Sequence, residues 1–179
     1  MRITSGRTMV PLMLALALAG CGADRTGPGG ISANCGLAGS SRGNVTGAVS
    51  TSLTGCALFT VSTTASGSST AIVLAAGTAA TPTHTLTLGR ANGARLAVGS
   101  YTIGTGANQL VGSFTFDAST GDRQFTLTSG TINITASSAS SLTGTYTSLT
   151  GFESATPANT ISITGSFTAR CTATSSTTC

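Results

Sequence analysis

Residues 159–169 read NTISITGSFTA, and this stretch predicts the fold of the chain. Apolar and hydroxylated side chains alternate along it, so that Ile161, Ile163, Gly165, Phe167 and Ala169 share one face of an extended chain. A period of two is the signature of a β-strand that packs one face on a core and turns the other to water. The segment therefore predicts a half-buried strand with a hydroxyl-rich outer face.

The same alternation recurs along the chain from Val45 onward. The segments that show it are 45–49, 57–61, 71–74, 84–88, 101–103, 114–116, 125–127, 132–134 and 142–146. Glycine-containing stretches at 91–94, 119–122 and 128–131 separate some of these segments and predict hairpin turns. We therefore predict an all-β fold, an antiparallel β-sandwich of about 8–10 strands, at the strand spacing typical of such folds. After the first twenty residues no amphipathic run has the length of a helix, which argues against a parallel βαβ architecture.

The composition supports this prediction. Hydrophobic residues make up 40% of the chain, there are 24 Gly residues and no Trp, and only 7% of the residues are charged. Average domains carry about a quarter charged residues, so the Ser and Thr hydroxyls must supply most of the solubility. Abundant β-branched residues and glycines favour strands and turns over helices.

The amino-terminal segment has a different pattern. Arg2 and Arg7 precede an apolar run over residues 9–19, which is too short to span a bilayer comfortably and is typical of a signal peptide. Leu18, Ala19 and Gly20 then lead to Cys21. This order of a Leu, two small residues and a Cys resembles the lipobox of bacterial lipoprotein precursors.

The resemblance implies diacylglyceryl transfer to the Cys21 thiol, cleavage between Gly20 and Cys21, and acylation of the new amino group. Two or three acyl chains hold a protein on a membrane far longer than one. Residue 22 is Gly rather than Asp, which implies the outer membrane in a cell that has one. An ordinary secretory signal with Cys21 as a chance residue, or a short transmembrane anchor, remain the alternatives.

The predicted organisation has three parts. Residues 1–20 form the signal peptide, residues 21–43 a lipidated Cys and a flexible tether rich in Gly, Ser and Pro, and residues 44–179 the β-sandwich domain. The stretches GSYTI (99–103), SGTINI (129–134), LTGTY (142–146) and ITGSF (163–167) resemble uncharacterised bacterial β-sandwich lipoproteins. This resemblance implies a fold and carries no catalytic residue.

The formal net charge is +4, and removal of Arg2 and Arg7 would halve it. The remaining arginines are scattered singly through the chain and form no basic stripe. They are Arg25, Arg42, Arg90, Arg95, Arg123 and Arg170. With few aromatic residues for base stacking, the sequence predicts no nucleic-acid partner.

Four cysteines remain after Cys21, namely Cys35, Cys56, Cys171 and Cys179. In an exported protein an even number predicts two disulfides. One pattern pairs Cys35 with Cys56 and Cys171 with Cys179, which closes two local loops; the others tie the two ends of the domain together. Zinc sites have closely spaced ligand pairs that this chain lacks, so we predict no metal.

The few residues that could carry chemistry form no recognised catalytic motif. His84 is the single His, and no Gly-x-Ser-x-Gly elbow accompanies it. Asp117 and Asp122 flank a turn without the further acids of an EF-hand, and Glu153 stands alone.

We therefore predict no enzyme activity and no cofactor. The expected function is that of a membrane-anchored lipoprotein of the cell envelope, acting as a structural or binding module. A surface module that binds carbohydrate or protein, through the hydroxyl-rich sheet face or the loops near Tyr101 and Tyr146, is the alternative. A hydrolase with an unrecognised site is a further one.

Overall fold

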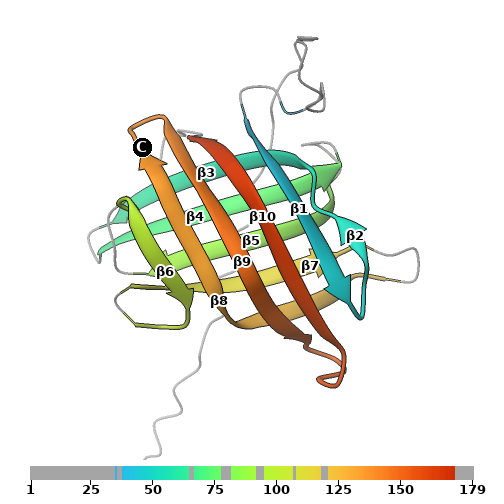
Figure 1. Cartoon of the computed structure of the whole chain (residues 1–179). Coiled ribbons are helices and arrows are strands. Elements are labelled where there is room, and N and C mark those ends of the chain that lie inside the picture. The colour runs from blue at the N-terminus through green and yellow to red at the C-terminus, as the bar shows by residue number, and fades with distance from the viewer. Residues whose placement is uncertain are drawn as a thin grey trace, which may run out of the picture.

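The computed structural model describes residues 35, 38–64, 67–77, 82–91, 95–106, 108–117 and 121–171 (Figure 1). The predicted signal peptide, Cys21, most of the predicted tether and Cys179 lie outside these residues. All regular structure in the described part is β-strand, which confirms the prediction of an all-β fold.

Among the described residues no helix is long and apolar enough to cross a membrane.

In the described part of the chain, ten strands form one sheet. They are β1 (Gly39–Gly47), β2 (Thr51–Ser52), β3 (Gly55–Thr64), β4 (Gly67–Gly77), β5 (Pro82–Ala91), β6 (Gly99–Ile103), β7 (Gln109–Phe116), β8 (Arg123–Ser137), β9 (Ser141–Glu153) and β10 (Thr160–Cys171). Most neighbours are antiparallel, and the parallel pairs β6–β7 and β3–β10 each extend over two residue pairs.

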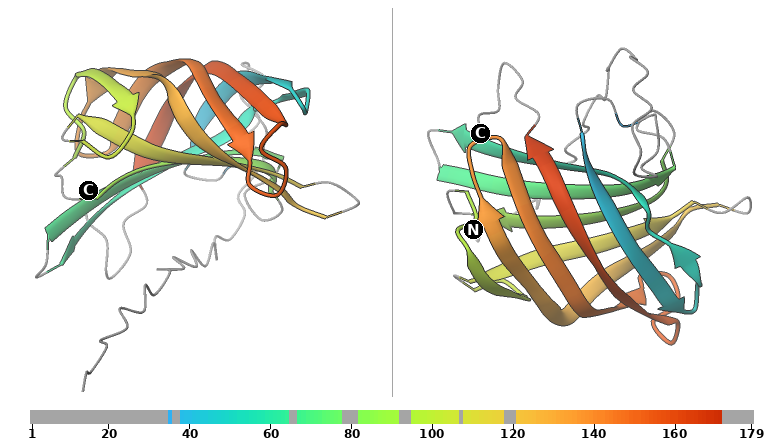
Figure 2. Two further views of the ribbon diagram at one scale, coloured as in Figure 1. Left: turned by 90° about the horizontal axis from the view of Figure 1, so that it is seen from below. Right: turned by 45° about the horizontal axis from the view of Figure 1, so that its top comes forward.

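The sheet closes on itself because its first and last long strands are neighbours. β1 pairs with β10 from Ser40↔Thr168 to Gly47↔Ile161, and β3 pairs with both β1 and β10. In Figures 1 and 2, β1, β10, β9 and the later part of β8 form one layer that crosses over β3, β4, β5 and β7. The core lies between these two layers, as in sheet packings where strands bend from one layer into the other.

The first strand begins earlier than we predicted. Residues 39–43, which we placed in the tether, belong to β1 and pair with β10 and β3. Their sequence, GSSRG, has no large apolar side chain, so it carries no hydrophobic period from which a strand could be predicted. Hydrogen bonding to two neighbouring strands places them in the sheet instead.

The predicted hairpin at 128–131 is wrong, because β8 runs through it without interruption. Gly130 has a φ of +125°, and the register with β9 shifts between Leu127 and Ser129 and again between Ser129 and Thr131. These are the marks of a bulge that bends a strand. Before the bend β8 pairs with β7, and after it with β6. Figure 1 shows β8 curving from one layer into the other.

The two other predicted turns lie partly outside the described residues. The segment 119–122 connects β7 and β8, which pair antiparallel as a hairpin requires. The segment 91–94 connects β5 to β6, but β5 pairs with β4 and β7 and not with β6. That turn therefore joins strands that are not neighbours, so it makes no hairpin.

The inner faces of both layers supply one hydrophobic core, mostly of Leu, Ile and Val with a few aromatic rings. Ile161, Ile163, Phe167 and Ala169 are buried, as their alternation predicts. Tyr146 is fully buried, and a Cβ added at Gly165 would lie 2.5 Å from its hydroxyl oxygen. Gly165 therefore interrupts the apolar face because the phenol ring needs that space.

Candidate functional site

The cysteines follow the local pairing pattern where the structure describes them. Cys35 and Cys56 form a disulfide across 21 residues. Cys171 is also disulfide-bonded, while Cys179 lies outside the described residues. The pattern in which Cys35 or Cys56 would tie the two ends together is thereby excluded. Pairing of β1 with β10 joins those ends instead.

The Cys35–Cys56 disulfide lies on the outer side of the sheet. Cys56 is buried but is not part of the core cluster, whereas the next residue, Ala57, belongs to it. Cys56 also pairs in register with Ser40 of β1. Cys35, fourteen residues after Cys21, is therefore covalently held where β1 and β3 meet. Cys21 and Gly20 themselves lie outside the described residues.

His84 points toward one end of the core from β5. Its ring stacks on Phe116 with centroids 4.5 Å apart, and its Nε2 atom lies 3.0 Å from the Thr51 hydroxyl. Its Nδ1 atom is buried and has no hydrogen-bond partner among the described residues. A catalytic His of the triad type is oriented by a carboxylate on that nitrogen. The described contacts of His84 hold the short strand β2 and show no such carboxylate.

Glu153 lies at the same end of the core and is engaged by two partners. Arg123 donates from Nε to Oε1 and from Nη2 to Oε2, each at 2.8 Å, and the Asn159 amide donates to Oε2 at 2.6 Å. Hydrogen bonds from Arg123 and Asn159 lower the pKa of Glu153 to about 2. Arg123 also donates to the carbonyl oxygen of Ala48 at 3.1 Å. The cluster links β8, β9 and the residues that follow β1, so these contacts stabilise the fold.

Asp117 and Asp122 are both exposed at the ends of the β7–β8 connection. In the described ranges no group of three or more His, Cys, Asp or Glu side chains is arranged to hold a metal ion. Neither concavity described below is lined by Asp117, Asp122, His84 or Glu153.

The two tyrosines lie on strands β6 and β9, and their side chains are buried inside the fold. Tyr101 is 6% exposed and donates to the Ala97 carbonyl at 3.0 Å. Tyr146 is 0% exposed and donates to the Arg42 carbonyl at 3.3 Å, and burial raises its pKa. Both rings fill the core because they alternate with polar neighbours on a strand. Neither can stack on a ligand at the surface.

The outer side of the β1–β10–β9–β8 layer is covered with hydroxyl groups, and we call it the hydroxyl face. Its members are the outward-facing Ser and Thr residues of these strands: Ser40, Thr46, Thr126, Thr128, Thr135, Thr143, Thr145, Thr147, Thr150, Thr160, Ser162, Thr164, Ser166 and Thr168. Arg42 and Arg170 are the charged residues at the outward positions of these described strands.

Strand pairing aligns the hydroxyl groups in rows. Ser40 pairs with Thr168, which pairs with Thr143, and the Thr143 hydroxyl donates to that of Thr168 at 3.4 Å. In the next row Ser166 pairs with Arg42 on one side and Thr145 on the other. Spacings of about 4.8 Å between strands and about 6.8 Å along them follow from sheet geometry.

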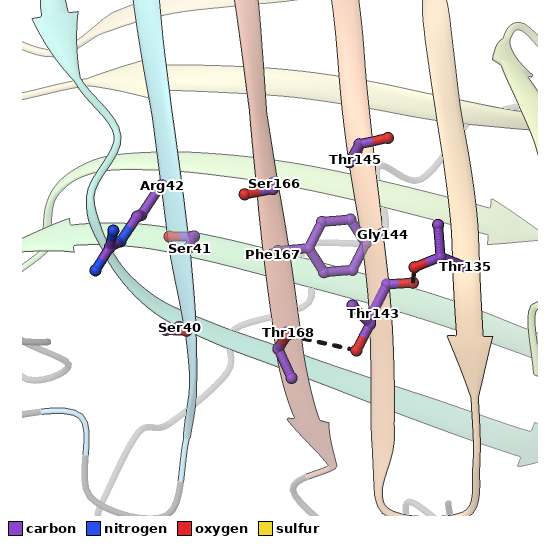
Figure 3. Close-up of a pocket in the computed structure, with 10 residues that line it drawn as sticks. All are labelled: Ser40, Ser41, Arg42, Thr135, Thr143, Gly144, Thr145, Ser166, Phe167 and Thr168. Atoms are coloured by element: carbon purple, nitrogen blue, oxygen red, sulfur yellow. Dashed lines mark hydrogen bonds between the residues drawn. The ribbon is translucent and has the colours of Figure 1, made fainter. Parts of the chain in front are cut away.

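Two shallow concavities on the hydroxyl face share Ser40 and Thr168, and we call them together the furrow. The larger, of about 330 Å³, is lined from four neighbouring strands, with Thr135, Thr143, Thr145 and Ser166 among its residues (Figure 3). The smaller, of about 210 Å³, extends past Ser40 to Ala38 and Arg170. The furrow is a shallow surface lined mainly by hydroxyl groups.

The furrow could be predicted only in part. Alternation identifies Thr143, Thr145, Ser166 and Thr168 as outward-facing strand residues, and the hydroxyl-rich sheet face was expected as a possible binding surface. Ser40 and Arg42 were missed because they were assigned to the tether. Their place in the furrow depends on the pairing of β1 with β10, for which the local sequence has no signal.

No protein-family model, curated protein or solved structure matches this chain.

Proposed function

We propose that the protein is a lipid-anchored lipoprotein of the cell envelope that acts as a non-catalytic binding module through its hydroxyl face. The observation that supports this proposal best is the Cys35–Cys56 disulfide. It attaches Cys35 to Cys56 of β3, which pairs in register with Ser40 of the furrow. An anchor at Cys21 would therefore hold the furrow at a limited distance from the membrane.

The distance follows from chain geometry. Cys35 comes fourteen residues after Cys21. A fully extended chain covers about 3.3–3.6 Å per residue, so Cys35 can stand at most about 50 Å from the lipidated residue. The proposed module therefore samples the layer of the envelope that borders its membrane.

The absence of a catalytic motif in the sequence supports a binding role over hydrolysis. Among the residues weighed for catalysis, Glu153 is held by Arg123 and Asn159, and His84 shows no orienting carboxylate among its described contacts. The furrow, in contrast, offers hydroxyl groups at regular positions on rigid strands. Binding sites on strands are held more precisely than sites on loops.

Metabolic labelling with radioactive palmitate tests the anchor. Cells that produce the full precursor should incorporate label and retain the protein in the membrane fraction, and Cys21→Ser should abolish both. The Cys56→Ser variant keeps Cys21 and is the control for the loss of a cysteine elsewhere in the chain. It should still incorporate label. Label on the Cys21→Ser protein would overturn the lipoprotein assignment.

The non-catalytic part of the proposal has its own test. The purified full chain is incubated with ester, peptide and glycan substrates beside the His84→Ala variant. We expect no turnover by either protein. Turnover by the unchanged chain that disappears in His84→Ala would establish a hydrolase and overturn this part.

A further inference from the structure

We infer that the furrow binds an uncharged polysaccharide strand. This inference deepens the binding role proposed above by naming the class of ligand. It rests on the shape of the furrow, the chemistry of the groups that line it, and their charge.

The shape fits an extended chain. Ser40 and Thr168 line both concavities, so the furrow continues from Thr135 on β8 across β9 and β10 to β1 and Arg170. Small ligands are usually bound in deep pockets that bury most of their surface. A shallow furrow across four strands leaves one side of its occupant exposed to water. A polymer can lie along it over several repeating units.

The chemistry fits a hydroxylated ligand. A Ser or Thr hydroxyl donates one hydrogen bond and accepts up to two, and a sugar hydroxyl does the same. The rows of the hydroxyl face therefore present a repeated pattern of groups that can each pair with either role of a sugar hydroxyl. The contact between Thr143 and Thr168 is long, at 3.4 Å, so a ligand can replace it at small cost.

The charge favours an uncharged strand. Arg42 and Arg170 are the charged residues that line the furrow, and no described carboxylate lines it. Binding to a polyanion draws most of its affinity from many Lys and Arg contacts and weakens steeply with salt. Two arginines supply little of this effect, whereas guanidinium groups also donate hydrogen bonds to neutral oxygens.

The burial of the aromatic residues near the furrow determines how strongly it should bind a sugar chain. Phe167 borders the furrow but is 3% exposed, and both tyrosines are buried. Among the described residues no aromatic ring at the furrow is available to stack on a sugar. Each sugar unit is then held by hydrogen bonds alone, which contribute modestly because water competes for the same groups. Affinity should therefore rise with chain length, because successive units of one strand bind as linked sites.

Co-sedimentation with insoluble chitin and insoluble cellulose tests the inference. The full chain, purified in a mild detergent, should sediment with at least one of these uncharged polymers. Retention should persist in 0.5 M salt, at which electrostatic interactions are largely screened. Soluble oligosaccharides of the retained polymer should compete better as they lengthen.

Two matched double variants separate the furrow from the rest of the surface. Thr143→Val with Thr168→Val removes two furrow hydroxyls and keeps β-branched side chains, so retention should fall about tenfold. Thr85→Val with Thr87→Val makes the same change at half-buried outward positions of β5, on the other layer, and should leave retention unchanged. Circular dichroism and the thermal midpoint check that each protein is folded.

If the furrow double variant fails to fold, Thr145→Val and Ser166→Ala replace it, since both side chains are exposed. Equal losses in furrow and control variants would overturn the inference, as would no retention on either polymer. Retention on anionic alginate alone that is lost in 0.5 M salt would also overturn it, because binding would then come from the arginines and not from the hydroxyl groups. Purified protein is used, so failure of palmitate labelling would contradict the anchor without touching this result.

Discussion

Arg123 and Glu153 form a two-point ion pair in which both carboxylate oxygens accept a guanidinium hydrogen bond at 2.8 Å. The pair joins the start of β8 to the end of β9, and Asn159 and Ala48 connect it to two further segments. A planar guanidinium matches a carboxylate in this geometry better than a Lys ammonium does. The pair therefore stabilises the end of the core where β2 and His84 also lie.

Stability should fall in acid because of Glu153. Its pKa is about 2 in the folded protein against an ordinary value of 4.5, so the unfolded chain binds the proton more tightly. The contribution is fully present above about pH 4.5 and is lost as the pH falls toward about 2. Urea unfolding at pH 7, 4 and 2.5 should show this loss. The Glu153→Gln variant should be less stable at pH 7, and its free energy of unfolding should change less between pH 4.5 and 2.5. Asp122→Asn, which changes an exposed carboxylate directly before β8, is the control and should follow the unchanged chain.

Gly165→Ala should destabilise the fold by about 1–3 kcal/mol, the usual cost of overpacking. A Cβ at this position would lie 2.5 Å from the Tyr146 hydroxyl oxygen, and it would also press on the Arg42 carbonyl. Gly89→Ala is the matched control, because its Cβ would meet no atom closer than 3.8 Å. The free energies of unfolding of the two variants should differ clearly. Equal stabilities of Gly165→Ala and Gly89→Ala would show that the Tyr146 ring and the Arg42 carbonyl can both move away from the added Cβ without cost.

Loss of the Cys35–Cys56 disulfide should lower stability by about 2–4 kcal/mol, since the bond restricts a loop of 21 residues in the unfolded chain. The Cys35→Ser and Cys56→Ser variants should lose similar amounts, and their double variant should lose no more than either. Thermal unfolding measures this. A much larger loss in the double variant would mean that the two cysteines contribute separately.

Peptide mapping under non-reducing conditions should find Cys171 joined to Cys179. Cys171 is disulfide-bonded and Cys35 is joined to Cys56, which leaves Cys179 as the partner we predict. The short Ser- and Thr-rich segment between them permits a local loop. A linkage of Cys171 to Cys21 would contradict this prediction and the lipidation of Cys21 together.

Gly130→Val should be more damaging than a change at the exposed glycine of the neighbouring turn. A Cβ at Gly130 would lie 2.6 Å from the Leu149 Cα, and its φ of +125° is strained for a β-branched residue. Gly121 also has a positive φ but an added Cβ would meet no atom within 4 Å, so Gly121→Val is the control for backbone strain alone. Urea unfolding should show the larger loss for Gly130→Val, because it adds steric overlap to the same strain.

From Val45 onward the sequence by itself determined most of the strand segments and which of their side chains turn inward. Ile161, Ile163 and Phe167 alternate with hydroxyl residues, and their burial follows because successive side chains of a strand point to opposite faces. The count of four cysteines after Cys21 predicted two disulfides for a similar local reason, since thiols pair in oxidising surroundings.

Only the tertiary structure decided which strands are neighbours. Every strand offers the same backbone donors and acceptors, so the pairing of β1 with β10 is chosen by packing between residues more than a hundred positions apart. Because of that pairing, Ser40 and Arg42 lie in the sheet and not in the tether that the sequence predicted. The close packing of Gly130 against Leu149 of β9 likewise brings together residues that are not neighbours in sequence. The furrow exists because β1 aligns its hydroxyl groups with those of the consecutive strands β8, β9 and β10, which are distant from it in sequence, and no local pattern encodes that alignment.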